Sequence, residues 1–187
     1  MANNNNVSAG KPLVAGAIYR ALITEDLVIP EDATSELSED FVSLGFISDG
    51  GLEADMSRSS DDYRDWSGSV IYTAEKEKND TFKYECVEHL NIEVLKMIYG
   101  DDNVTGTVET GITIKSNAKE LSKACYVIDM ILTGDIIKRV VIPSGKISEI
   151  GSIVYKSDDI IRHEITVSAL ACDDEGNTHF EYLKKKA

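Results

Sequence analysis

The chain has 187 residues, of which 19 are basic and 33 acidic, so its formal net charge at pH 7 is −14. This length suits one domain with a substantial core. The acidic balance argues against a protein that grips nucleic acid, because phosphate contacts depend on Lys and Arg. No basic segment followed by an apolar one opens the chain, and no apolar run approaches the ~20 residues of a membrane helix. We therefore expect neither an export signal nor membrane insertion.

The first part of the chain alternates polar stretches with short apolar runs. Residues 1–10 are small and polar and are expected to form a flexible N-terminal arm, followed by a single domain over 11–187. Apolar runs at 15–23 and 41–48 predict two strands. The acidic segment 24–40 between them predicts a long irregular connection.

Charged residues dominate the next stretch. Residues 49–67 carry a dense run of charges and are expected to form a long surface loop. Residues 69–75 and 81–87 each alternate apolar and polar side chains, which is typical of half-buried antiparallel strands. The charged residues 76–80 between these strands predict a turn.

One short helix is predicted at about residues 91–99. Asn91 is a suitable N-cap, and Glu93 places a negative charge in the first turn. Gly100 stands where a glycine commonly ends a helix. A helix of about two and a half turns is too short to be stable alone, so it is expected to pack against a sheet.

The C-terminal half is predicted to consist of strands and turns. Strands are expected at about 112–116, 124–132, 135–142, 146–154, 160–171 and 178–184. Turn residues separate them, as in Pro143-Ser144-Gly145. The fold class expected is therefore mainly β: an antiparallel β-sandwich or barrel with one short flanking α-helix.

The sequence contains no recognisable catalytic, metal-binding or cofactor-binding motif. The three histidines are isolated from one another, and there is no nucleophile elbow, Walker A loop or GxGxxG segment. The three cysteines lie far apart without CxxC spacing and are expected to be reduced, mostly buried thiols. Acidic runs at 101–103 and 173–175 fit turns better than calcium loops. We expect a protein that is not an enzyme.

Several segments, taken together and in order, carry a family resemblance. They are KPLVAGAIY (11–19), FVSLGFISDGGL (41–52), DWSG (65–68), KNDTFKY (78–84), LKMIYGDDNVTG (95–106), VIDMILTGDIIKRVVIP (127–143) and EGNTHFEYLK (175–184). Over about residues 11–185 the chain resembles the major tail proteins of siphophages. The resemblance implies a tail-tube fold whose subunits form hexameric rings that stack into a hollow tube, through which genomic DNA passes during ejection.

The resemblance also implies roles for particular residues. Polar members of alternating strands are candidates to face the lumen: Thr73, Glu75, Glu85, Glu149, Glu164 and Thr166. Residues of the charged segment are candidates for contacts between rings: Arg58, Asp61, Asp62, Arg64 and Trp66. Whether Trp66 is exposed at a contact or packs beneath the loop is left open.

The implied partners are further copies of the chain, a tape-measure protein in the lumen during assembly, and terminator and distal tail or baseplate proteins at the ends. DNA would pass without specific binding, in a virion tail assembled in the host cytoplasm. Alternatives are the inner tube of a contractile tail or injection machine and a ligand-binding β-sandwich, for which Tyr63 and Trp66 are the only local aromatic pair. A hydrolase on a β scaffold has no motif in support.

Overall fold

A computed structural model describes residues 2–186. The elements in chain order are η1 (Asn4–Asn6), β1 (Gly10–Pro12), β2 (Ile18–Leu22), β3 (Val42–Ser43), β4 (Ile47–Arg64), β5 (Val70–Cys86), α1 (Ile92–Tyr99), η2 (Asp101–Asn103), β6 (Val104–Thr105), β7 (Thr113–Ile114), β8 (Ala124–Leu132), β9 (Ile136–Ile150), β10 (His163–Ala169) and β11 (Phe180–Lys185). Within these residues, nine strands form one open sheet in the order β3-β2-β8-β9-β10-β5-β4, with β1 paired to β8 and β11 to β9. The mainly antiparallel β fold with one flanking α-helix is confirmed.

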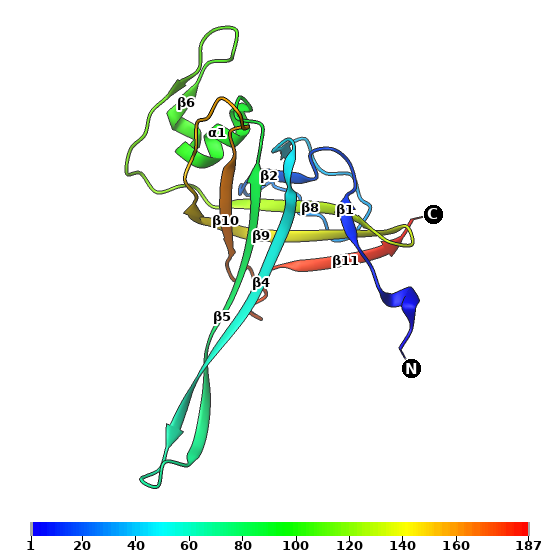
Figure 1. Ribbon diagram of the computed structural model, residues 1–187, viewed down its shortest axis with the longest axis vertical. Coiled ribbons are helices and arrows are strands. Elements are labelled where there is room, and N and C mark those ends of the chain that lie inside the picture. The colour runs from blue at the N-terminus through cyan, green and yellow to red at the C-terminus, as the bar shows by residue number, and fades with distance from the viewer. Residues whose placement is uncertain (1, 187) are drawn as a thin grey trace.

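The sheet folds over itself along β9. The first part of β9 pairs with β8 and β11, and the part that follows Pro143 pairs with β10. Figure 1 shows β4, β5 and β10 crossing in front of β8 and β9. The turn predicted at Pro143-Ser144-Gly145 is therefore wrong, because β9 continues through these residues. Gly145 permits the close crossing, since a Cβ there would lie 2.7 Å from the ring of Tyr126 and 2.9 Å from Val167.

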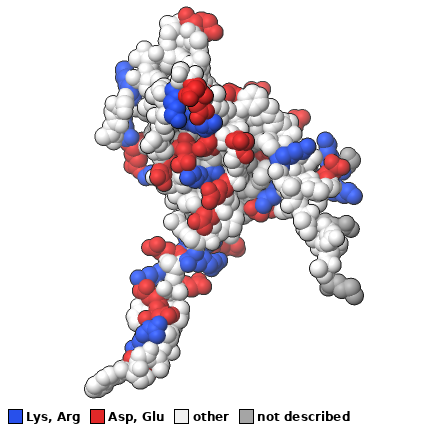
Figure 2. Space-filling view, in the orientation of Figure 1, with Lys and Arg blue, Asp and Glu red and all other residues white. Residues whose placement is uncertain are grey.

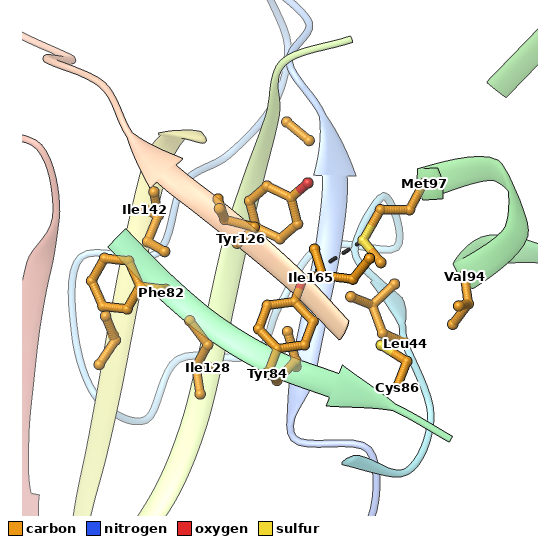
Figure 3. Close-up of a cluster of buried hydrophobic side chains, with 14 of the residues drawn as sticks. Leu44, Phe82, Tyr84, Cys86, Val94, Met97, Tyr126, Ile128, Ile142 and Ile165 are labelled. Carbon is orange, nitrogen blue, oxygen red and sulfur yellow. Dashed lines mark hydrogen bonds between the residues drawn. The ribbon is translucent and has the colours of Figure 1, made fainter. Parts of the chain in front are cut away.

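The main hydrophobic core lies between the two crossing layers. Phe82 and Tyr84 of β5 and Ile165 of β10 are buried in one cluster with Tyr126 of β8, as Figure 3 shows. Helix α1 closes one end of this core, where the Tyr84 hydroxyl donates to Sδ of Met97 at 3.6 Å. Burying each large apolar side chain stabilises the fold by about 1.5–3 kcal/mol, so this cluster fixes how the layers cross.

The predicted helix is confirmed together with its caps. The side chain of Asn91 accepts a hydrogen bond from the backbone N–H of Glu93 at 3.0 Å. Gly100 ends the helix with φ 99°, and its N–H donates to the Lys96 carbonyl at 2.8 Å. Local capping chemistry therefore accounts for both ends of α1.

Segment 24–40 contains no helix or strand, as predicted. Its apolar side chains pack over a second buried cluster on the other face of β8 and β9. Arg139 of β9 holds the segment in place, since it pairs with the Asp129 carboxylate at 2.7 and 2.9 Å and donates to the Ser35 carbonyl at 2.8 Å. Both β8 and β9 are thus covered on two sides.

The hairpin of β4 and β5 is the largest departure from the sequence-based expectation. Residues 49–67 were expected to form a surface loop and residues 76–80 a turn, and both predictions are wrong. β4 pairs with β5 from Leu52 opposite Tyr84 to Arg64 opposite Val70. The outer part extends well away from the body (Figure 1). We call residues 57–79 the projecting hairpin.

The N-terminal residues are joined to the sheet at their end. β1 pairs with β8, with Gly10 opposite Leu132. The Ala9 N–H donates to Oγ1 of Thr133 at 3.0 Å, and the Thr133 N–H donates to the Ala9 carbonyl at 3.0 Å. The flexibility of the arm and the division at residue 10 remain predictions.

Candidate assembly interface

The face of β4, β5, β9 and β10 that points away from the core is polar and largely acidic. In this face Glu85 lies opposite Glu164, while Thr166 lies opposite Lys83 on one side and Glu149 on the other. Figure 2 shows acidic side chains gathered over the centre of the body, where β4, β5 and β10 cross. Four of the six residues proposed from the sequence to face a lumen are therefore neighbours on one surface.

Lys83 lies within this acidic face and partly neutralises it. Its Nζ is 3.0 Å from a carboxylate oxygen of Glu164. The hydrogen bond to Glu164, followed by the nearby charges of Glu53 and Glu149, raises the pKa of Lys83. The surface thus combines an acidic majority with a cation that pairs with Glu164.

The structure places the other two lumen candidates on the projecting hairpin. Oγ1 of Thr73 donates to Asp62 at 2.8 Å, and Glu75 lies 3.6 Å from Arg58. All five candidates for contacts between rings lie on the hairpin or in its turn: Arg58, Asp61, Asp62, Arg64 and Trp66. The candidate residues therefore form two separate groups, one on the sheet face and one on the hairpin.

The projecting hairpin has no hydrophobic core of its own. Almost all of its residues are exposed on both faces of the ribbon. Ion pairs join the two strands, with Lys76 2.5 Å from Asp61 and Arg58 near Glu75, but exposed pairs contribute only about 0–1 kcal/mol each. An isolated two-stranded ribbon is only marginally stable in water. Packing against a partner would therefore stabilise this segment.

The turn that joins β4 to β5 is well ordered by its own side chains. The Asp65 carboxylate accepts from the Ser67 hydroxyl at 2.7 Å and from the Ser69 N–H at 2.9 Å. These hydrogen bonds, with that from Ser67 the strongest, lower the pKa of Asp65. The turn holds Trp66 fully exposed, at 104% of its reference area, which decides the question left open by the sequence.

Trp66 belongs to an apolar patch that sequence reasoning recognised only in part. Tyr63, Val70, Ile71 and Tyr72 are also exposed beside the turn, and the rings of Tyr63 and Tyr72 lie 5.9 Å apart. We call these five residues the tip patch. The alternation of residues 69–75 predicts a half-buried strand, so the exposure of Val70 and Tyr72 could not be anticipated without knowing that the ribbon leaves the body.

Asp80 marks the point where the hairpin leaves the body. Its side chain is buried, and Oδ2 lies 2.8 Å from Nζ of Lys78 and accepts from the Thr178 hydroxyl. Burial alone raises the pKa of Asp80, but the hydrogen bonds from Lys78 and Thr178 outweigh it and the net shift is downward. This cluster ties the root of the hairpin to the segment that precedes β11.

The sheet leaves several strand edges open within residues 2–186. β4 pairs only with β5, and β11 pairs only with β9. The part of β9 after Gly145 has β10 on one side alone. Unpaired backbone groups along such edges are ready to accept another strand.

Two kinds of site can be checked directly in the described residues, namely metal clusters and membrane-spanning helices. No group of three or more His, Cys, Asp or Glu side chains in residues 2–186 is arranged to hold a metal ion. The helices of this part of the chain fall short of the length and apolar character needed to cross a membrane. Two histidines that are isolated in the sequence do meet, since Nδ1 of His89 lies 2.9 Å from Nε2 of His163.

Comparisons with known proteins give one decisive match. A comparison with curated proteins yields no match. Among solved structures, a sheath–tube complex of an extracellular contractile injection system is similar over 92% of this chain and 93% of its own, at 10% identity and a TM-score of 0.43. The tube-terminating cap of an anti-feeding prophage is similar over 93% of both chains, at 9% identity and a TM-score of 0.43.

Because these TM-scores lie below 0.5, the assignment depends on the family match, which extends over residues 1–187. Members of the matched family are structural components of the phage tail and not enzymes. The polar sheet face, the open edges and the projecting hairpin thus occur in a chain that belongs to the phage tail tube protein family.

Proposed function

We propose that this tail tube protein forms hexameric rings that stack into a hollow tube, and that genomic DNA passes through the tube during ejection. The observation that carries the proposal is an open sheet with an acidic outer face, joined to a long hairpin that has no core of its own. Open strand edges expose a monomer to aggregation and an unsupported hairpin is only marginally stable, whereas in an assembly both can form contacts between subunits.

Ring closure would use the open strand edges. β4 and the part of β9 after Gly145 lie at opposite sides of the same four-stranded layer. Pairing one edge with the other edge of a neighbouring copy is a heterologous contact, and such contacts close into rings when the rotation permits. Strand addition would then turn an aggregation hazard into the bond between subunits.

The acidic sheet face is the surface that best suits a lumen. Joined layers would carry Glu85, Glu149 and Glu164 of every copy around one channel. Carboxylates repel the phosphates of DNA, and a field that decays over about 10 Å at 0.1 M salt still acts across a narrow channel. DNA would therefore slide along this surface without binding to it.

The projecting hairpin would connect successive rings, with the N-terminal arm as a second link. The hairpin extends beyond the body, where it can reach another copy (Figure 1). A tape-measure protein would occupy the lumen during assembly, and terminator and distal tail or baseplate proteins would bind the open ends. The virion tail would be assembled in the host cytoplasm.

Negative-stain microscopy of the purified protein tests the proposal. Incubation at high concentration, alone and with tail-initiating components, should give rings or tubes with a central channel. A protein that remains monomeric under both conditions would contradict the proposed assembly. A variant with the acidic sheet face intact but residues 57–79 replaced by a short turn should form rings that fail to stack.

A further inference from the structure

An open groove with apolar walls lies beside α1, in the half of the molecule opposite the tip patch. The segment that precedes α1 forms one wall with Val87 and Leu90, and the segment that precedes β10 forms the other with Ile160 and Ile161. The groove has a volume of about 830 Å³, and Leu90 and Ile160 are 62% and 57% exposed. Apolar side chains left in water on a groove wall are typical of an interaction site.

The side chains at the base of the groove are already packed against one another in the free subunit. His163 is completely buried at the start of β10, and its Nε2 lies 2.9 Å from Nδ1 of His89, which lines the groove. The two rings are stacked with centroids 5.1 Å apart, and Tyr155 contacts His89 edge-on at 5.9 Å. A ring held on two sides presents a fixed surface, which lowers the entropy cost of binding.

The positions of the groove and the tip patch suit a head-to-tail contact. Figure 1 shows the turn of the projecting hairpin at one end of the long axis, and the orange segment before β10 lies beside α1 in the opposite half, below the green loop that follows β6. When two copies are stacked in the same orientation, the exposed Trp66, Ile71 and Tyr72 of one copy can therefore contact the groove of the next. Each surface carries one basic and one acidic residue, which permits opposite charges to pair: Arg64 and Asp65 flank the tip, and Lys156 and Asp159 line the groove.

We propose that the tip patch of one copy inserts into the groove between residues 87–90 and 156–161 of a copy in the next ring, with Trp66 as the central side chain. This inference rests on the proposed function, because it names the partner surface of the projecting hairpin. The occupant is a second copy of this chain, and the contact joins rings rather than neighbours within a ring.

The size of the contact explains why it would act only in a stack. Three aromatic side chains bury about 150–250 Å² each, or roughly 450–750 Å² together. A stable interface between two free proteins buries about 800 Å² on each side. One contact is therefore marginal, but contacts repeated around a ring bind at high effective concentration. Free subunits should remain unpaired through this surface while rings are held firmly.

Site-directed cross-linking tests the contact. Two single variants, Ile71→Cys and Ile160→Cys, are made in a Cys172→Ser background, since Cys86 and Cys125 are buried. The two proteins are mixed, assembled into tubes and oxidised. A disulfide requires Cα atoms within about 7 Å, so dimers joined through positions 71 and 160 should form in tubes and not among free subunits.

A matched control is available at the same end of the molecule. Val108 lies in the loop between β6 and β7 and is 57% exposed, as Ile160 is. Ile71→Cys mixed with Val108→Cys should give no more dimers in tubes than free subunits do. Tubes that form with equal cross-linking at positions 108 and 160 would overturn the groove as the partner surface and leave the tube function standing. A parent protein that forms no tubes would instead overturn the proposed function.

A second measurement tests the contact without cysteine substitutions, in case the cysteine variants fail to assemble. Trp66→Ala and Leu90→Ala, singly and together, are compared for the concentration at which tubes separate into rings. Each single change should raise this concentration at least tenfold. The double change should add little to either, because contacting residues are not additive. Independent effects, in which the two fold-changes multiply, would show that these residues do not meet.

Discussion

β5 passes through two environments along one unbroken strand. In its second part every other side chain is buried, namely those of Asp80, Phe82, Tyr84 and Cys86. In its first part, residues 70–79 are exposed on nearly every side. The backbone pairing with β4 continues through both parts. Backbone pairing with β4 therefore suffices to give β5 its extended shape, while side-chain burial decides which part is stable without a partner.

Truncating an aromatic side chain in each part of β5 gives the largest expected contrast. Phe82→Ala should lower the free energy of unfolding of the subunit by roughly 3–5 kcal/mol, because it leaves a cavity in the core. Tyr72→Ala, ten residues earlier in the same strand, should change it by less than about 0.5 kcal/mol. Urea unfolding followed by circular dichroism measures both. Equal losses would mean that the projecting hairpin packs against the body.

A smaller effect is expected from pH, and it should be confined to the body. Burial, with a further contribution from the charge of His89, lowers the pKa of His163 below its usual 6.5. The unfolded chain then binds a proton that the folded chain resists, so stability should be complete above pH 6.5 and fall as the pH drops below it. Glu88, Lys156 and Asp159 are the other charged groups that line the same groove.

The histidine variant separates this effect from general acid sensitivity. Urea midpoints at pH 8 and pH 5 should differ less in His163→Gln than in the parent protein. Thr166→Val, on the polar face of the same strand, leaves the His89–His163 pair intact and should keep the parent's difference between the two midpoints. A parent protein whose midpoint is the same at both pH values would contradict the argument.

Breaking an ion pair of the projecting hairpin should have a weaker effect. Lys76→Ala removes the contact with Asp61, which is worth about 0.2–1 kcal/mol in an exposed ribbon. Amide hydrogen exchange of residues 57–79 should accelerate in free subunits, while exchange of β8 and β9 stays the same. In assembled tubes the acceleration should disappear, since the neighbouring ring would hold the ribbon. Acceleration of equal size in tubes would argue against such a partner.

Reversing charge on the sheet face should change the stability of the subunit least. The double change Glu85→Lys and Glu149→Lys alters side chains on the solvent side of the sheet, so the free energy of unfolding should move by less than about 0.5 kcal/mol. Tubes should still form, but DNA ejection from phage that carry the variant should slow because DNA now binds the channel. Glu25→Lys with Asp26→Lys makes the same charge change in segment 24–40 and should leave ejection normal.

Elements with local chemical signals could be predicted from the sequence. The caps of α1 are encoded by Asn91 and Gly100, and β8 is apolar apart from the paired Asp129 because segment 24–40 and the core cover its two faces. The projecting hairpin has no such signal. Its β4 strand is polar on both faces, so the period-two alternation that identifies a half-buried strand is missing there, and the alternation at residues 69–75 does not reveal that the ribbon leaves the body.

The candidate sites also differ in whether a local sequence signal reveals them. Glu85, Glu149 and Glu164 could be singled out by alternation, but only the pairing of β5, β9 and β10 brings them together. The groove could not be foreseen, because its walls come from residues about 70 apart in sequence and its floor requires His89 and His163 to meet. Contacts between distant segments leave no periodic pattern.

The unbroken course of β5 beyond Asp80 also makes the hairpin a measure of length. From Asp80 to Val70 the strand takes ten residue steps of about 3.3 Å, so the tip stands roughly 33 Å from the buried root. The root is fixed by Lys78 and Thr178, and the turn is fixed by Asp65. In a stack, the number of residues in the outer part of β5 would set the distance between the root of one hairpin and the groove that receives its tip. The length of this strand would therefore set the distance between successive rings.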